Sequence, residues 1–157
     1  MKEENRRDVL VSIQPEYASK IIDGSKSVEL RRRFPESINR SSRVVIYSTS
    51  PIQAVVGYAV IESVRRLSIN QLWQQYGGAA CIDQTKFDKY FTGLKAGYAI
   101  LLSEVKRFKH IIPAAILQNK FGFVAPQSFR YISSEYQQLF SNERVQVTHR
   151  HEHIHRP

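Results

Sequence analysis

Residues able to carry out chemistry gather in one short stretch, "GSKSVELRRRFP", at positions 24–35. Apolar and charged positions alternate along it, a pattern typical of a half-buried strand. Side chains of a strand point to alternate faces, so Glu29, Arg31 and Arg33 are expected to share one face. Lys26 lies close by, where the strand begins. The pattern predicts a charged face formed by these four residues.

A carboxylate between cations suits more than one kind of site. Arginines keep Glu29 ionised, and their remaining donors bind a phosphate or carboxylate ligand. Desolvation and like charge lower the pKa of a partly buried lysine, which makes Lys26 a usable base or nucleophile, with Glu29 as general acid or base. The same groups also suit binding alone, with cations on phosphates and the glutamate on a base amino group. A third interpretation is an exposed face whose ion pairs contribute about 0.2–1 kcal/mol each.

Two later segments add candidates. Tyr47, Ser48 and Thr49 end a buried strand, so their polar tips are expected to open into the same cleft, although Tyr47 also suits the core. Ser128 and Arg130 lie in "PQSFRY", which is expected to be a loop. A base of single-stranded RNA could stack on the ring of Phe129 or Tyr131. Both rings could equally well anchor the loop to the barrel.

The elements that position these residues follow from periodicity and from turn residues. Gly57 lies inside the longest strand candidate and predicts a bulge or sharp bend there. About five strands with helices inserted between them predict an α+β fold with a small curved sheet or barrel. Strands are expected at 8–14, 24–35, 43–49, 52–67 and 96–108, and helices at 15–24, 68–77 and 83–93, followed by a short helix, a loop broken by Pro126 and a final helix.

The chain of 157 residues fits one domain. We expect an N-terminal tail at 1–8, a single domain at 9–140 and a His-rich, frayed extension at 141–157. Four histidines alternate between His149 and His155, a pattern that suits a transition metal. Because an unanchored terminal site binds weakly, no metal and no cofactor is predicted.

The balance of charge favours a polyanionic partner. Lys and Arg number 23 against 14 Asp and Glu, a formal net charge of +9, which favours nucleic acid, although such an excess also aids solubility. No helix-turn-helix or zinc-finger spacing supports a reader of duplex DNA. No apolar run approaches the ~20 residues of a membrane span, and no signal peptide is visible. Cys81 has no disulfide partner, so a cytoplasmic location is expected, while the oligomeric state is not specified.

Residues 24–31, "GSKSVELR", resemble the G-x-K-x-x-E-x-R signature of the ASCH family, which has a PUA-like β-barrel fold. The motif follows the first strand and helix, as it does in that family. The resemblance extends roughly from residue 9 to residue 132 and implies about five to six strands with short helices between them. The segments "VVIYSTSP" (44–51) and "VVGYAVIESV" (55–64) resemble the next two strands of the family. Residues 87–108 and 126–133 resemble a bacterial branch of the family that is labelled as predicted transcriptional regulators.

The resemblance implies that Lys26, Glu29 and Arg31 line an RNA-binding cleft. Some ASCH proteins hydrolyse an acylated cytidine with a lysine at the position of Lys26, but have threonine where this chain has Glu29. Others are described as metal-dependent ribonucleases. The leading prediction is an RNA or modified-nucleotide binding module, with a role in regulating transcription or translation. The alternatives are a hydrolase acting on a nucleoside or on RNA through Lys26 and Glu29, and a protein-binding adaptor.

Overall fold

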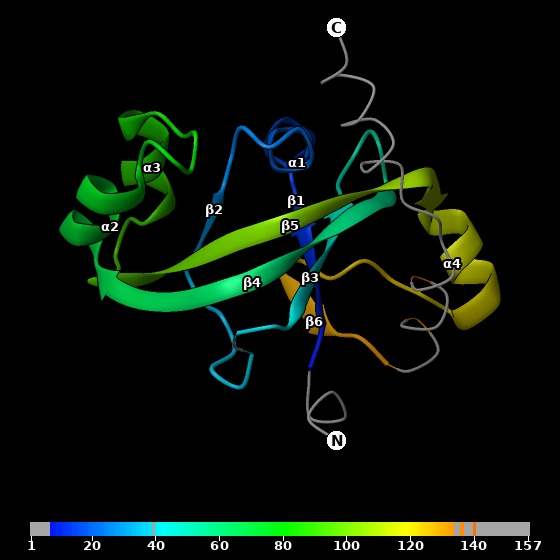
Figure 1. Ribbon diagram of the computed structural model, residues 1–157. Coiled ribbons are helices and arrows are strands. Elements are labelled where there is room, and N and C mark those ends of the chain that lie inside the picture. Colours follow the sequence, from blue (N-terminus) through cyan, green and yellow to red (C-terminus); the bar gives the residue numbers. More distant parts are fainter. Residues whose placement is uncertain (1–6, 39, 134–135, 137–139, 141–157) are drawn as a thin grey trace, which may run out of the picture.

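In this computed structural model, one twisted sheet of six strands spans the described part of the chain, which is residues 7–38, 40–133, 136 and 140. The order across the sheet is β2-β5-β4-β3-β1-β6, and neighbours are antiparallel except β1 and β3. The sheet curls into a half-barrel, which confirms the predicted α+β fold (Figure 1). The strands are β1 (Val9–Ile13), β2 (Val28–Arg31), β3 (Arg43–Ser48), β4 (Ala54–Ser68), β5 (Ala96–Pro113) and β6 (Phe129–Tyr131).

Short helices surround the long ribbon formed by β4 and β5. One helix, α1, lies over the middle of the ribbon, α2 and α3 lie at one end, and α4 lies at the other (Figure 1). None of the helices among the described residues is long and apolar enough to cross a membrane. The helices are α1 (Pro15–Ile22), α2 (Ile69–Tyr76), α3 (Gln84–Tyr90) and α4 (Ala114–Phe121).

The helix boundaries follow from local signals in the sequence. Ser68 caps α2 and forms a capping box with Gln71, as its Oγ accepts the Gln71 backbone N–H at 3.3 Å. Asp83 caps α3, where its carboxylate accepts the Lys86 N–H at 2.8 Å. Gly24, just beyond α1, has φ +90°, which a glycine adopts without strain. Both helices therefore begin beside the residues at which the sequence predicts them to start, Ser68 and Asp83.

Gly57 permits the bend in β4 that the sequence predicts. The register between β4 and β5 shifts between Val55 and Gly57. A Cβ at Gly57 would collide with the backbone carbonyl of Lys106 and with the side chain of Ile22. The absence of a Cβ at Gly57 therefore lets α1 pack closely on the ribbon. Strand β5 continues five residues past its expected end, because β4 pairs with it as far as Pro113.

The described residues show one strand that the sequence does not predict. Residues 126–131 are expected to form a loop, whereas Phe129–Tyr131 pair with β1 as β6, with Val9 opposite Tyr131. Three residues are too few for an alternating pattern to be recognised, and their pairing depends on the free edge of β1. Most of the expected final helix, the tail up to residue 6 and the His-rich extension 141–157 lie outside the described residues.

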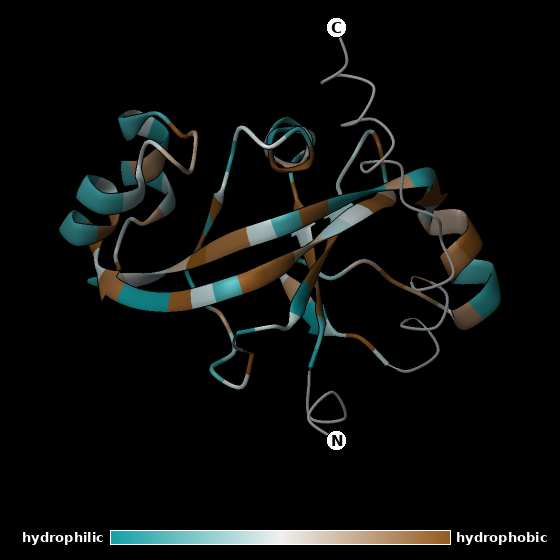
Figure 2. Ribbon diagram, viewed as in Figure 1, coloured by the Kyte–Doolittle hydropathy of each residue, from teal (hydrophilic) through white to brown (hydrophobic). Residues whose placement is uncertain are grey.

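Three apolar clusters fill the space around the sheet. Alternate residues of β1 divide between two of them: Val9 and Val11 face the α1 side, and Leu10 faces the α4 side. Val28 and Leu30 join the third cluster, beneath α2 and α3. Apolar residues accordingly concentrate on the strands, and hydrophilic residues on the outer turns of α2 and α3 (Figure 2).

Candidate functional site

A cavity of about 660 Å³ opens beside β2, between α1 and α3. We call it the β2 cavity. Its floor includes Lys26, Glu29 and Arg31 of the signature segment, and its walls include Tyr17 of α1 and Tyr90 at the end of α3. The predicted alternation along β2 is confirmed for residues 28–31, since the apolar pair enters a core cluster and the charged pair faces the cavity.

Glu29 lies between two cations in a buried position. Lys26 Nζ is 3.4 Å from Glu29 Oε1, and Arg31 Nη1 is 2.9 Å from Glu29 Oε2. All three residues are at most 9% exposed. The two cations therefore neutralise the carboxylate, and the floor as a whole carries a positive charge.

The Lys26 ammonium is fully hydrogen-bonded within the protein. Besides its contact with Glu29, it donates to the carbonyls of Val28 at 2.9 Å and Ala80 at 2.6 Å. An ammonium has three donors, so all three have partners. The Tyr17 ring lies beside it, 5.3 Å from Nζ to the ring centroid. Burial lowers the pKa of Lys26, although the Glu29 carboxylate acts in the opposite direction.

Arg31 ties β2 to two distant segments. Its Nη1 donates to the Ser12 carbonyl at 3.3 Å, and its Nη2 donates to Ser128 Oγ at 2.8 Å. Ser12 in turn donates its N–H to the Ser128 carbonyl and its hydroxyl to the Pro126 carbonyl. The structure thus brings Ser128 to the edge of the site as a partner of Arg31, although Ser128 is not among the residues that line the cavity.

The three consecutive arginines have three different environments. Arg31 belongs to the buried floor, whereas exposed Arg32 donates through Nη1 to the carbonyls of Tyr90 at 2.6 Å and Thr92 at 3.3 Å. These carbonyls lie at the end of α3, where cationic side chains are favoured. Strand β2 ends at Arg31, so the expectation that Arg33 shares its face is wrong: Arg33 is exposed and does not line the cavity.

Tyr47 and Ser48 do not line the β2 cavity, contrary to expectation. Alternation along β3 places Tyr47 with Val45 in the cluster on the α4 side, where its ring centroid is 5.9 Å from that of Phe123. Burial raises the pKa of the Tyr47 phenol. Ser48 is buried, and of these three expected residues Thr49 alone lines the cavity.

Arg130 also lies away from the β2 cavity. Its guanidinium is 5.7 Å from the ring centroid of Phe123 and 5.4 Å from that of Tyr136. In the register of β6 it is opposite Leu10, which faces the α4 side. Pairing with β1 therefore turns Arg130 away from Arg31.

The sequence pattern does not single out Lys86 and Lys89, which line the cavity together with Tyr90. These positions are three and four residues apart, so they lie on one side of α3. Tyr90 is half-buried there, and burial raises the pKa of its phenol. The helical spacing is visible in the sequence, but the side that meets β2 depends on how α3 packs.

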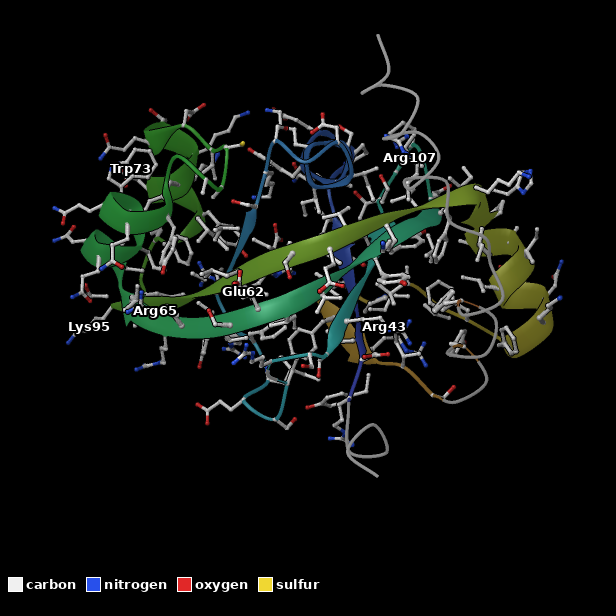
Figure 3. All side chains as sticks on the ribbon, in the orientation of Figure 1. Arg43, Glu62, Arg65, Trp73, Lys95 and Arg107 are labelled. Carbon is white, nitrogen blue, oxygen red and sulfur yellow. The ribbon has the colours of Figure 1, made fainter. Side chains whose placement is uncertain are left out.

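Other cations serve the framework. Arg43 Nη2 is 3.1 Å from Asp8 Oδ2, and its guanidinium is 5.0 Å from the Tyr58 ring centroid. Arg65 donates to the Tyr76 hydroxyl at 2.7 Å. Figure 3 shows Arg65 near one end of the β4–β5 ribbon and Arg43 beside β3, and neither lines the cavity. Among the residues that the structure describes, no group of three His, Cys, Asp or Glu is placed to hold a metal.

Comparison with known proteins agrees with this geometry. A family model described as a domain of unknown function, DUF365, matches residues 7–122. The "ASCH domain-containing ribonuclease" of Zymomonas mobilis is 32% identical over 131 residues, which are 83% of this chain and 88% of the relative.

Solved structures of ASCH from Zymomonas mobilis have the same fold. One superposes with a TM-score of 0.81 at 32% identity and covers 87% of this chain and 96% of the other. A variant of that protein with serine replaced by alanine has a TM-score of 0.82 at 32% identity, and the match covers 89% of this chain and 99% of the other. Sequence and fold therefore agree over most of both chains, and this protein belongs to the ASCH domain family and carries the DUF365 domain.

Proposed function

We propose that this ASCH domain binds single-stranded RNA and holds one nucleotide in the β2 cavity. The observation that carries the proposal is the lining of the cavity, which includes four cationic side chains and only one carboxylate. Small-molecule sites are roughly 300–1,000 Å³, so a cavity of about 660 Å³ is large enough for a nucleotide. Glu29 is already paired with Lys26 and Arg31, so it does not repel a phosphate.

Aromatic side chains support the choice of an unpaired nucleotide. Tyr17 and Tyr90 line the cavity from α1 and α3. Proteins that bind single strands commonly stack bases on such rings, whereas bases within a duplex are not accessible for stacking. The name of the Zymomonas mobilis relative, a ribonuclease, supports RNA as the nucleic acid. Binding alone would suit a regulatory module.

The proposal can be tested with a pair of tyrosine variants. Removing a stacked aromatic ring costs about 1–3 kcal/mol per base, so Tyr17→Ala should weaken RNA binding by roughly 5–150-fold. Tyr131→Ala is the matched control, because Tyr131 is 39% exposed and does not line the cavity. Fluorescence anisotropy with a labelled single-stranded RNA pentanucleotide measures the RNA affinity of both variants. Equal affinity of the two variants, or no binding by the unmodified protein, would overturn the proposal.

Cleavage of the bound RNA is a second candidate function, favoured by the environment of Lys26. Burial lowers the pKa of Lys26, which increases the share of neutral amine that can act as a base. In such a reaction the amine takes the proton of the ribose 2′-hydroxyl, and the 2′ oxygen attacks phosphorus. The bond to the 5′ oxygen then breaks, and the Lys26 ammonium returns the proton to that oxygen. The products are a cyclic phosphate and a free 5′-hydroxyl.

A further inference from the structure

Two lysines of α3 lie one turn apart on the wall of the β2 cavity. Lys86 and Lys89 both line it, and residues three apart on a helix have Cβ atoms about 5–6 Å apart. Neighbouring phosphates along a nucleic-acid strand have a comparable spacing. The two ammonium groups can therefore contact consecutive phosphates of one chain.

Both lysines are available to a ligand. They are exposed, and neither forms an ion pair with another described residue. Of the acidic residues beside them, Asp83 caps α3 by accepting the Lys86 backbone N–H, and Asp88 does not line the cavity. By contrast, the floor cations already have partners inside the protein. Free positive charge is therefore concentrated on the α3 wall.

The wall is held in place by contacts with β2 and its flanking residues. Arg32 donates to the Tyr90 carbonyl at 2.6 Å, at the end of α3. Lys26 donates to the Ala80 carbonyl at 2.6 Å, in the segment that joins α2 to α3. Lys26 and Arg32, on either side of β2, thus fix the position of the helix that carries the two lysines.

We propose that Lys86 and Lys89 bind two phosphates next to the nucleotide in the cavity, so that the ligand is an RNA chain and not a free nucleoside. This inference rests on the proposed function and adds the residues that bind the phosphates of the RNA chain. A free nucleoside has no phosphate and so cannot use the α3 wall. A chain gains one contact for each lysine.

Salt dependence of binding tests the inference. For single strands the slope of log K against log salt changes by about 0.7 for each phosphate contact. The double variant Lys86→Ala/Lys89→Ala should lose about 1.4 of the slope measured for the RNA pentanucleotide. Lys109→Ala/Lys120→Ala is the matched control, because both residues are exposed and outside the cavity. It should keep the full slope.

The outcomes separate this inference from the proposed function. Equal loss of slope in the two double variants would overturn the inference, as would nucleoside binding as tight as that of the pentanucleotide. If Tyr17→Ala weakens RNA binding while the Lys86→Ala/Lys89→Ala variant keeps the full salt dependence of RNA binding, only the inference fails. If Tyr17→Ala leaves RNA binding unchanged, the proposed function fails.

Discussion

At the scale of single residues, the signature side chains spend most of their hydrogen-bonding capacity inside the protein. Lys26 has three acceptors, and Arg31 contacts Glu29, Ser12 and Ser128. Buried polar groups need such partners, since an unpaired buried donor costs about 1–3 kcal/mol. The signature therefore joins β2 to the ends of β1 and α2 as well as forming the floor of the cavity.

The role of Lys26 can be tested through pH. Since its pKa is lowered by burial, the neutral amine increases as pH rises through that lowered value. If Lys26 is the base, RNA cleavage should become faster over this range and then level off, and Lys26→Met should abolish cleavage without abolishing binding. Mass spectrometry of products from the RNA and from N4-acetylcytidine, at pH 6 to 10 with a protein-free control, gives the rates.

Three results would contradict a role for Lys26 as the base of RNA cleavage. Cleavage that persists in Lys26→Met would assign the base to another residue. Products from N4-acetylcytidine but not from RNA would instead identify a nucleoside hydrolase. If the protein binds RNA but converts neither substrate, it is a binding module and not an enzyme acting on these substrates.

At the scale of elements, the bend of β4 positions α1 and thereby Tyr17. The backbone of Lys106 and the side chain of Ile22 leave no room for a Cβ at Gly57. This feature is predictable from the sequence, as are the caps of α2 and α3, because each depends on neighbours in the chain. The pairing of β6 and the orientation of α3 depend on distant partners, so the sequence predicts neither Arg130 on the α4 side nor Lys86 on the cavity wall.

Two glycine variants test this view of the bend. Gly57→Ala should lower the free energy of unfolding by about 1–3 kcal/mol, because the new methyl group overpacks the ribbon. Gly78→Ala is the control: a Cβ there meets no atom within 4 Å, and such a change can add about 0.4–1 kcal/mol. Urea denaturation followed by circular dichroism measures both. Equal stability of the two variants would show that β4 bends for another reason.

At the scale of the whole molecule, position matters more than the amount of charge. The formal net charge of +9 suggests a polyanionic partner but does not locate it. Arg43 and Arg65 support the framework, and Arg130 lies against aromatic rings on the α4 side. Strand alternation in "VELR" correctly predicts Glu29 and Arg31 on one face. Extending it to Arg33 fails because the chain leaves the sheet after Arg31.

The central claim is that RNA occupies the β2 cavity, and an NMR titration tests it most directly. Adding the single-stranded RNA pentanucleotide to the ¹⁵N-labelled protein should shift the backbone amide signals of Tyr17, Lys26 and Lys89. Signals near Arg130 on the α4 side should stay in place. Shifts confined to the α4 side, or no shifts at RNA concentrations that saturate binding measured by anisotropy, would contradict the account.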